Sequence, residues 1–368
     1  MRVLMTGGGT AGHINPAIAI ANTIKKNIPD AQIAFVGTKR GLENTLVPRE
    51  NYPLYHVNIM GISRSLSPKN VKAACLMISS QFEAKKIIKE FKPDIVIGTG
   101  GYVCWPALRV AAKMGIPTLA HESNARPGLA IKQLQGKLDR ILVNFKDTEK
   151  YISDKEKVIH VGNPLRGGFG GLDYIEARKK LNIPDGKVYV LAFGGSLGAQ
   201  RINETVFAYM KNVAKNDDRV ICHLATGKNY FEDFGAQFKA AGLENSDNLS
   251  IMEYIHDMHV RMSAADIIIC RAGAMTISEL AMMKKACVMI PSPNVVDNHQ
   301  YKNAKVLFDA NAVVMLEESV MNDEIFAQRI NELIESPSTR DELARNISQF
   351  AKPDANKLIF DEIIKLTK

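Results

Sequence analysis

The chain has 368 residues, of which 46% are hydrophobic and 23% charged, a composition that fits a globular protein of about two domains. No stretch approaches the roughly 20 apolar residues of a membrane span, and the first residues predict a strand rather than a signal peptide, so we expect neither a span nor export. Lys and Arg outnumber Asp and Glu by 47 to 39, which favours anionic partners without choosing among nucleic acids, nucleotide sugars and lipid headgroups. The five cysteines lack C-x-x-C spacing and predict neither zinc nor disulfides.

Short β-branched runs alternate with longer helical patterns in the first half, which is typical of a parallel sheet built from β-α-β units. We expect strands at 2–6, 32–36, 94–98, 117–120, 140–143 and 157–161. Helical patterns cover 16–26, 70–91 and 127–136. The glycine-rich stretch GNPLRGGFGG, residues 162–171, has no periodicity and predicts a linker between domains.

A second α/β series begins after this linker. The strand KVYVLAF is followed by the glycine turn GGSLGAQ and the helical pattern RINETVFAYMKNV. Further strands are expected at 219–224, 249–252, 266–270, 286–290 and 312–315. Two such series predict two Rossmann-like domains, whose ligands bind beyond the carboxyl ends of the strands. The last helical pattern, 354–367, needs a packing surface, and we expect it to return to the first domain.

The stretch TGGGTAGHINP, residues 6–16, joins a strand to a helix, and its glycines fit the dinucleotide spacing G-x-G-x-x-G. A helix N-terminus favours phosphate, although glycines could serve strand–helix packing alone. An NAD site needs an acidic residue at the tip of the second strand, where this chain has Thr38, Lys39 and Arg40. Lys39 and Arg40 could accept the extra phosphate of NADP, so an NADP-dependent oxidoreductase stays open. His13, in the first helical turn, is instead a candidate base.

Other motifs follow expected strands. GGSLG fits the hydrolase pattern G-x-S-x-G at Ser196, with Asp266 or Asp297 and His299 in triad order, but no H-G-G-G stretch precedes it, so a phosphate-binding turn is favoured. HESNARPG places His121, Glu122 and Asn124 where side chains reach a ligand, unless they cap the next helix. The chain has neither Asp-x-Asp nor G-K-[ST], so we expect no metal and no cofactor.

Seven motifs in order, GGGTAGHINP, GTGGYVCWP, HESNARPG, GNPLR, GGSLGAQ, RAGAMTISEL and DNHQ, together resemble the MurG family of peptidoglycan N-acetylglucosaminyltransferases. The resemblance implies the α/β GT-B fold, with two Rossmann-like domains facing a cleft. The first, 1–163, binds acceptor and membrane, the second, 164–352, binds UDP-GlcNAc, and a helix at 353–368 returns to the first. The implied reaction is inverting transfer of GlcNAc from UDP-GlcNAc to the MurNAc 4-hydroxyl of lipid I, forming lipid II. A non-catalytic nucleotide-sugar-binding subunit is the other alternative to the transferase.

The resemblance also assigns site residues. His13 would be the general base, since imidazole has an ordinary pKa of about 6.5, with Glu122 or water as the alternative. Gly100, Gly101 and Tyr102 would contact the acceptor. Glu279 would bind the ribose diol, unless it only favours the helix dipole. The positions implied to bind UDP-GlcNAc are Thr10, Ala11, Gly12, Asn124, Arg166, Ser196, Ile255, Ala274, Met275, Thr276, Ile277, Ser278, Glu279 and Gln300. Ala11 replaces a glycine of the family loop, which would strain the loop if that position requires positive φ.

Because the implied acceptor is linked to a lipid, we expect the protein to bind the membrane. The basic segment 61–92 would dock on the anionic inner leaflet at the cytoplasmic face of the membrane. Its basic residues are Arg64, Lys69, Lys72, Lys85, Lys86, Lys89 and Lys92, against Glu83 and Glu90. Val71, Cys75, Ile78 and Phe82 share one helical face, and Leu76, Met77, Ile87 and Ile88 fall on others. We expect one set to pack inward and another to meet lipid, unless the segment is a solvated basic helix with a buried stripe. Trp105 is a further candidate for the lipid interface. Cell-wall synthesis proteins are expected partners, and nucleic acid is not.

Overall fold

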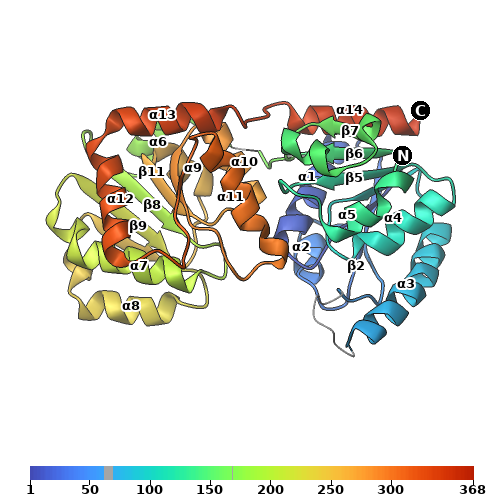
Figure 1. Cartoon of the computed structure of the whole chain (residues 1–368), viewed down its shortest axis with the longest axis horizontal. Coiled ribbons are helices and arrows are strands. Elements are labelled where there is room, and N and C mark those ends of the chain that lie inside the picture. Colours follow the sequence, from blue (N-terminus) through green and yellow to red (C-terminus); the bar gives the residue numbers. More distant parts are fainter. Residues whose placement is uncertain (62–68, 168) are drawn as a thin grey trace. The chain divides into compact units, whose positions relative to one another are not determined.

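The computed structural model describes residues 1–61, 69–167 and 169–368, and for Lys69 it describes the backbone only. Two compact units make up this part of the chain. Unit 1 consists of Met1–Arg166 and Lys352–Lys368, and unit 2 of Gly167–Ala351 (Figure 1). The chain therefore passes between the units at 166/167 and at 351/352, where the sequence predicted boundaries at 163/164 and 352/353.

Unit 1 is a parallel sheet covered by helices on both faces. The described strands pair in the order β3-β2-β1-β4-β5-β6-β7. Their bounds are β1 Arg2–Thr6, β2 Gln32–Gly37, β3 Leu54–His56, β4 Ile95–Gly98, β5 Thr118–Glu122, β6 Arg140–Val143 and β7 Val158–His160. The helices are α1 Ala11–Asn27, α2 Glu43–Arg49, α3 Lys69–Phe91, α4 Cys104–Lys113, α5 Leu129–Leu134 and α14 Ala355–Thr367. Every strand expected for this half is present, and β3 is an addition.

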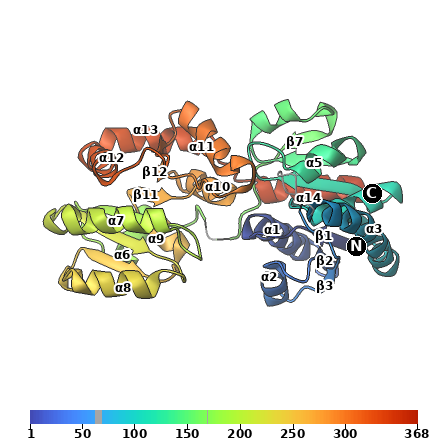
Figure 2. The same cartoon turned by 60° about the horizontal axis from the view of Figure 1, so that its bottom comes forward.

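The alternation of side chains along β1 divides the core of unit 1 into two layers. Val3 and Met5 belong to the layer beneath α1 and α14, whereas Leu4 belongs to the layer beneath α3 and α4. Ile359 and Ile363 of α14 are fully buried in the first layer, and α14 packs against α1 (Figure 2). The last helix thus completes the core of unit 1, because burying these apolar side chains stabilises it.

Unit 2 repeats this architecture with a second parallel sheet. Its described strands pair in the order β10-β9-β8-β11-β12-β13. Their bounds are β8 Val188–Phe193, β9 Val220–Ala225, β10 Leu249–Met252, β11 Ile267–Cys270, β12 Ala286–Met289 and β13 Val314–Met315. The helices are α6 Tyr174–Lys180, α7 Gln200–Asn212, α8 Phe231–Ala240, α9 Met258–Ala264, α10 Ala274–Met283, α11 His299–Asp309, α12 Asp323–Glu335 and α13 Pro337–Ser348. Continuous apolar runs such as β11 are fully buried, as expected of strands covered on both faces.

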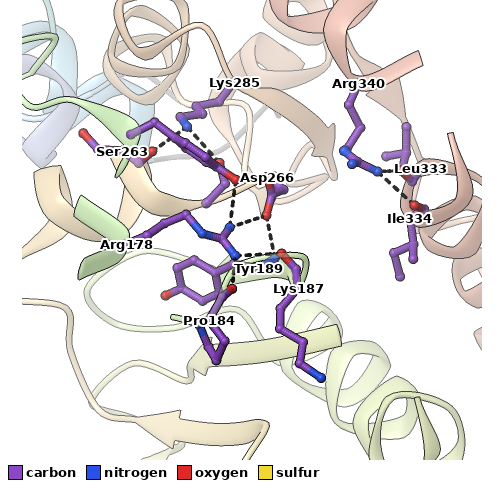
Figure 3. A network of polar contacts seen from close by, with 12 residues as sticks. Arg178, Pro184, Lys187, Tyr189, Ser263, Asp266, Lys285, Leu333, Ile334 and Arg340 are labelled. Atoms are coloured by element: carbon purple, nitrogen blue, oxygen red, sulfur yellow. Dashed lines mark hydrogen bonds and ion pairs between the residues drawn. The ribbon is translucent and has the colours of Figure 1, made fainter. Parts of the chain in front are cut away.

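A buried polar network closes the amino edge of the unit 2 sheet (Figure 3). Asp266, just before β11, accepts hydrogen bonds from the Tyr189 backbone N–H at 2.7 Å and from Arg178 Nη1 at 2.9 Å. The second guanidinium nitrogen of Arg178 donates to the Pro184 and Lys187 carbonyls at 2.9 and 2.7 Å. These charged hydrogen bonds satisfy groups that would be costly to bury alone.

Lys285 extends the network just before β12. Its Nζ donates to the Ser263 carbonyl at 2.6 Å and to the Ala265 carbonyl at 2.8 Å, and lies 5.0 Å from the centre of the Tyr174 ring (Figure 3). Burial lowers the pKa of Lys285 to about 8, because a desolvated ammonium group is disfavoured. The amino edge of the unit 2 sheet is therefore held by side chains of fixed geometry.

Candidate active site

The first glycine turn joins β1 to α1 in unit 1. Gly9 has a φ of +86° and supplies the left-handed residue of the turn, whereas Ala11 is the first residue of the helix and is not among the described residues with positive φ. The strain considered for Ala11 is therefore absent. Thr10 is the N-cap, and its carbonyl accepts from the His13 and Ile14 amides. The amides of Ala11 and Gly12 belong to the first helical turn, where no intrahelical acceptor exists, which suits them to an anionic group.

A second glycine turn, between β4 and α4, lies directly against the first. A Cβ atom added at Gly7 would lie 2.1 Å from Thr99 Oγ1, and one added at Gly101 would lie 2.5 Å from the Gly8 carbonyl oxygen. Gly100 and Gly101 have φ values of +105° and +78°. The two turns interlock at distances that only glycine permits.

His13 lies where these turns meet. Its Nδ1 is 3.2 Å from the Thr99 carbonyl oxygen, and Thr99 Oγ1 donates to the His13 carbonyl at 2.6 Å. A Cβ atom at Gly100 would lie 2.6 Å from the same Nδ1. A carbonyl can only accept, so Nδ1 carries the proton of the neutral ring and Nε2 is the basic nitrogen. This arrangement orients His13 as a general base requires.

His121 and Glu122 were expected to face a ligand, and this expectation is wrong. His121 Nε2 lies 2.9 Å from the Gly162 carbonyl, and burial lowers the His121 pKa to about 4. The buried Glu122 carboxylate accepts from the Asn124 and Gly128 amides at 3.0 and 2.8 Å, and burial raises its pKa. His121 is held by the segment after β7 and Glu122 shapes the turn before α5, so Glu122 is not placed to act as the base.

Two further residues that were predicted to contact the sugar donor, Asn124 and Arg166, belong to unit 1. Asn124 is half-buried, and its side-chain amide donates to Glu122 Oε1 at 3.1 Å. The exposed Arg166 lies near Asn15 of α1, with Nη2 3.4 Å from the Asn15 side-chain oxygen. Its nearest carboxylate, on Glu50, is 3.8 Å away. Arg166 therefore adds positive charge beside α1.

The carboxyl edge of the unit 2 sheet carries an open, polar pocket of about 410 Å³. The glycine turn after β8 forms one wall, with Gly195 at a φ of +103° and Ser196 exposed. The wall opposite comes from the segment after β12, where Gln300 Oε1 accepts from the Ser292 amide at 2.9 Å. The pocket combines a phosphate-binding type of turn with amide and hydroxyl groups suited to sugars.

The helix after β11 supplies six predicted contacts. Gly273 is the N-cap of α10, so Ala274, Met275 and Thr276 form its first turn, and Glu279 lies half-buried one turn further on. The side chains of Ile277 and Ser278 are buried, and the Ser278 hydroxyl donates to the Ala274 carbonyl at 3.2 Å. Ile255, in the segment after β10, is also buried and could offer a ligand only its backbone.

The hydrolase alternative has no geometric support. Ser196 follows the carboxyl end of β8, whereas Asp266 precedes the amino end of its neighbour β11 and is bound by Arg178. Asp297 pairs with Lys302 at 2.9 Å, and His299 Nδ1 lies 2.8 Å from the Val296 carbonyl. These groups do not form a triad around Ser196.

Three residues that shape the carboxyl edges of the two sheets were not predicted from the sequence. Glu43 binds the first glycine turn through the Gly9 amide at 3.1 Å. Asn303 is fully buried and donates to the Ala272 carbonyl at 3.2 Å, which fixes the entry to α10. Arg271 donates to the Ile290 carbonyl at 3.0 Å and pairs with Glu318 at 2.5 Å. The sequence carries a signal only for Asn303, which lies one turn after Gln300 on α11.

Two other expectations concern surfaces and metals. Trp105 was expected at a lipid interface, but it is buried in the core beneath α3 and α4, so that prediction is wrong. Across the described residues, no three His, Cys, Asp or Glu side chains gather as a metal site would require. Nor is any helix in the described ranges both long and apolar enough to cross a bilayer.

Two Rossmann-like units, each with a glycine turn and a helix N-terminus at the carboxyl edge of a parallel sheet, make up the GT-B fold, which one large class of glycosyltransferases adopts. Residues 3–143 match the glycosyltransferase family 28 N-terminal domain, and residues 189–359 match the glycosyltransferase family 28 C-terminal domain. The chain belongs to glycosyltransferase family 28 and is a glycosyltransferase. This membership favours the transferase over the oxidoreductase.

Relatives match over nearly the whole chain. A protein from Acetivibrio thermocellus is 44% identical over 99% of this chain and 98% of its own length, and one from Ruminiclostridium cellulolyticum is 42% identical over 98% of both. Both are named UDP-N-acetylglucosamine–N-acetylmuramyl-(pentapeptide) pyrophosphoryl-undecaprenol N-acetylglucosamine transferase. The crystal structure of Acinetobacter baumannii MurG is similar, with a TM-score of 0.80 and 30% identity over 99% of both chains. A UDP-GlcNAc 2-epimerase from Neisseria meningitidis, 16% identical over 99% of this chain and all of its own, shares the fold with a TM-score of 0.66.

Proposed function

We infer that this protein transfers GlcNAc from UDP-GlcNAc to the MurNAc 4-hydroxyl of undecaprenyl-diphospho-MurNAc-pentapeptide, lipid I, and so forms lipid II for peptidoglycan. The observation that carries this inference is the relatives' shared name over nearly the full length of both chains. The GT-B fold and the family 28 domains agree with it.

His13 is proposed as the general base. The Thr99 carbonyl orients the ring through Nδ1, so Nε2 takes the proton of the acceptor hydroxyl as its oxygen attacks the anomeric carbon. The bond from that carbon to the diphosphate breaks, and UDP leaves. In-line displacement of an α-linked donor gives a β-linked product. Gly100, Gly101 and Tyr102, which adjoin His13, are proposed to contact the acceptor.

The donor is assigned mainly to unit 2. The first-turn amides of α10 suit a diphosphate, and the Glu279 carboxylate suits a ribose diol because it can accept two hydrogen bonds. Gln300 lines the polar pocket, Ser196 is an exposed residue of the glycine turn that forms one of its walls, and the backbone of Ile255 is assigned to the uracil. Thr10, Ala11, Gly12, Asn124 and Arg166 supply the remaining proposed contacts from unit 1.

We assign the protein to the cytoplasmic face of the cell membrane, with α3 as the docking surface. Val71, Ile78 and Phe82 are 69%, 61% and 72% exposed, and Cys75 on the same face is exposed, whereas Ile87 and Ile88 pack into the core. The exposed lysines of the helix are Lys72, Lys85, Lys86 and Lys89. Apolar side chains ringed by cations suit an anionic bilayer. Arg64, another predicted cation, lies outside the described residues. Cell-wall synthesis proteins remain predicted partners.

The transfer reaction is tested by incubating the purified protein with radiolabelled UDP-GlcNAc and a lipid I analogue. Labelled disaccharide-lipid is the expected product. If a folded protein binds UDP-GlcNAc and makes no product, the non-catalytic alternative holds instead.

The docking surface is tested by sedimentation with vesicles of anionic phospholipid. Changing Lys72, Lys85, Lys86 and Lys89 to Glu should release the protein, because each lysine near such a surface contributes about 1 kcal/mol. The matched control changes four exposed lysines of unit 2, Lys179, Lys180, Lys211 and Lys215, to Glu and should sediment almost as the wild type does. Equal release by both variants would mean that net charge alone holds the protein to vesicles.

A further inference from the structure

Glu43, the first residue of α2, is a buried carboxylate that the proposed reaction does not use. Its side chain is 1% exposed. It accepts hydrogen bonds from the Gly9 amide at 3.1 Å, the Thr38 amide at 2.8 Å and the Thr38 hydroxyl at 2.9 Å. Buried carboxylates are tolerated where several donors replace water, as these three do.

Three glycines from separate parts of the chain make the space that this carboxylate fills. A Cβ atom at Gly8 would lie 2.9 Å from Glu43 Oε1, one at Gly37 would lie 2.5 Å from Cγ, and one at Gly41 would lie 1.9 Å from Oε2. None of these three glycines has a positive φ, so close approach, rather than backbone conformation, is the reason for glycine. The site is built around the Glu43 side chain.

Glu43 also lies near the second glycine turn. The Tyr102 ring is 3.6 Å from the position of a Cβ atom at Gly9. Burial raises the pKa of Tyr102, the negative charge of Glu43 raises it further, and a hydrogen bond with the Thr38 side chain lowers it. The first turn and the end of β2 therefore meet at this carboxylate, and Tyr102, the first residue after the second turn, packs against Gly9 close enough to sense its charge.

We propose that Glu43 is a positioning residue, which fixes the backbone at Gly8 and Gly9 and thereby sets the two glycine turns that hold His13 and Tyr102. This inference rests on the proposed function. Glu43 accepts the hydrogen bond of the Gly9 amide, so this amide does not bind the substrate. The negative charge of Glu43 also lies behind the turn. An anionic group of the substrate is therefore directed to the first-turn amides of α1 and not to the Gly9 amide.

Steady-state kinetics of Glu43→Gln test the proposal. Glutamine has the same shape but turns an NH₂ group toward backbone N–H donors, so at least one contact is lost. We expect the KM for the lipid-linked acceptor to rise about tenfold and kcat to fall about tenfold, the effect of one charged hydrogen bond. The KM for UDP-GlcNAc should rise less than the acceptor KM, since only the proposed contacts at Thr10, Ala11 and Gly12 come from the first turn and the donor is assigned mainly to unit 2.

Two companion variants sharpen this result. Thr38→Val removes one of the three contacts and should have a smaller effect of the same kind, which is not additive with Glu43→Gln. Glu362→Gln is the matched control, because Glu362 is another buried carboxylate of unit 1, held by Arg140 at 3.5 Å and Lys365 at 2.5 Å. Glu362→Gln should lower the Tm, and it should not raise the KM for the acceptor relative to the KM for UDP-GlcNAc. If Glu43→Gln behaves like Glu362→Gln, Glu43 is merely structural and the proposal is overturned.

A second measurement does not depend on activity. In Glu43→Gln the pKa of Tyr102 should fall, because the nearby negative charge is gone. Ultraviolet titration reports tyrosine ionisation, and Tyr102→Phe identifies this residue among the ten tyrosines. An unchanged Tyr102 titration would overturn the proposal. If the wild type makes no lipid II, the proposed function fails, but this titration still tests whether the Glu43 charge lies beside Tyr102, as the proposal requires.

Discussion

The carboxyl edges of the two sheets are built in opposite ways. In unit 1 the glycine turns interlock, with Gly101 against the Gly8 carbonyl and Gly100 against the His13 ring. In unit 2 the corresponding edge is open, with Ser196 exposed beside a polar pocket of about 410 Å³. Unit 1 thus presents a closed surface on which the proposed base, His13, is fixed, whereas unit 2 presents a space that a large polar ligand can fill.

The two units also differ in where buried charge lies. Unit 1 places Glu43 beneath its glycine turns, at the edge where the chemistry is proposed. Unit 2 places Asp266, Arg178 and Lys285 at the amino edge of its sheet, away from the pocket (Figure 3). Buried charge therefore holds the glycine turns of the proposed site in unit 1 and the amino edge of the sheet in unit 2.

The largest expected effect is that of His13→Ala. If unit 1 holds the base, transfer should fall about a thousandfold, while binding of UDP-GlcNAc changes little. Product formation and calorimetric binding measure the two quantities. His56→Ala, an exposed histidine of unit 1 that contacts Asn44 Oδ1, is the control and should stay near wild-type activity. Equal losses of transfer and donor affinity in His13→Ala would place His13 among the binding groups.

The next largest expected effect is the pH dependence of stability that Lys285 causes at the amino edge of the unit 2 sheet. Lys285 has a pKa of about 8 in the folded state against 10.5 as the ordinary value, so between these values the unfolded state binds more protons and the free energy of unfolding rises with pH. The rise should be about 3 kcal/mol, and below pH 8 the cost of burying the ammonium is fully present. Tyr174 and the buried Cys104, Cys222 and Cys270, whose pKa values are raised to about 12, have the opposite effect above about pH 9 because they ionise first in the unfolded state, so the Lys285 contribution is the difference between the wild type and Lys285→Met.

Urea unfolding at several pH values measures this slope. Lys285→Met should remove it, whereas Lys284→Met, which changes the exposed neighbour, should keep it. The same pH dependence of stability in the wild type and in Lys285→Met would show that Lys285 does not lose its proton on folding in this range.

A smaller effect is expected at the open edge of unit 2. Glu279→Gln should weaken UDP-GlcNAc binding about tenfold, because the neutral amide accepts a ribose hydroxyl less well, and should leave the acceptor KM unchanged. Calorimetry and kinetics measure these values. Glu244→Gln, at an exposed position of unit 2, is the control. An unchanged affinity would leave Glu279 only its interaction with the α10 dipole.

The smallest effect is predicted for Ala11→Gly, which restores the glycine of the family loop. Because Ala11 is the first helical residue of α1, the change should leave transfer unchanged and lower stability by less than about 1 kcal/mol. A large gain in kcat would show that the closed turn of unit 1 is strained by alanine.

Most of the fold could be predicted because buried parallel strands appear in the sequence as short apolar runs between helical patterns. The exception, β3, has only three residues, Leu54–His56, and none of its side chains is fully buried, so its pairing with β2 depends on the sheet already being in place. Trp105 was misassigned because an apolar residue at a helix start is equally consistent with core and surface.

The parts of the site that are formed by backbone turns could be predicted from the sequence. The roles that depend on the orientation of a side chain were harder to predict. The glycine turns and His13 follow from local spacing, whereas His121 and Glu122 bind backbone groups in the interior of unit 1. Glu43 reaches Gly9 across 34 positions of sequence, and its role depends on tertiary contacts alone.

The position of α14 has a consequence for the order of folding during synthesis. Unit 2 is one continuous segment, Gly167–Ala351, whereas the core of unit 1 includes Ile359 and Ile363, which the ribosome makes after all of unit 2. A nascent chain can therefore complete unit 2 while the α1 face of unit 1 still lacks its cover. The half of the protein that is translated first reaches its finished form last.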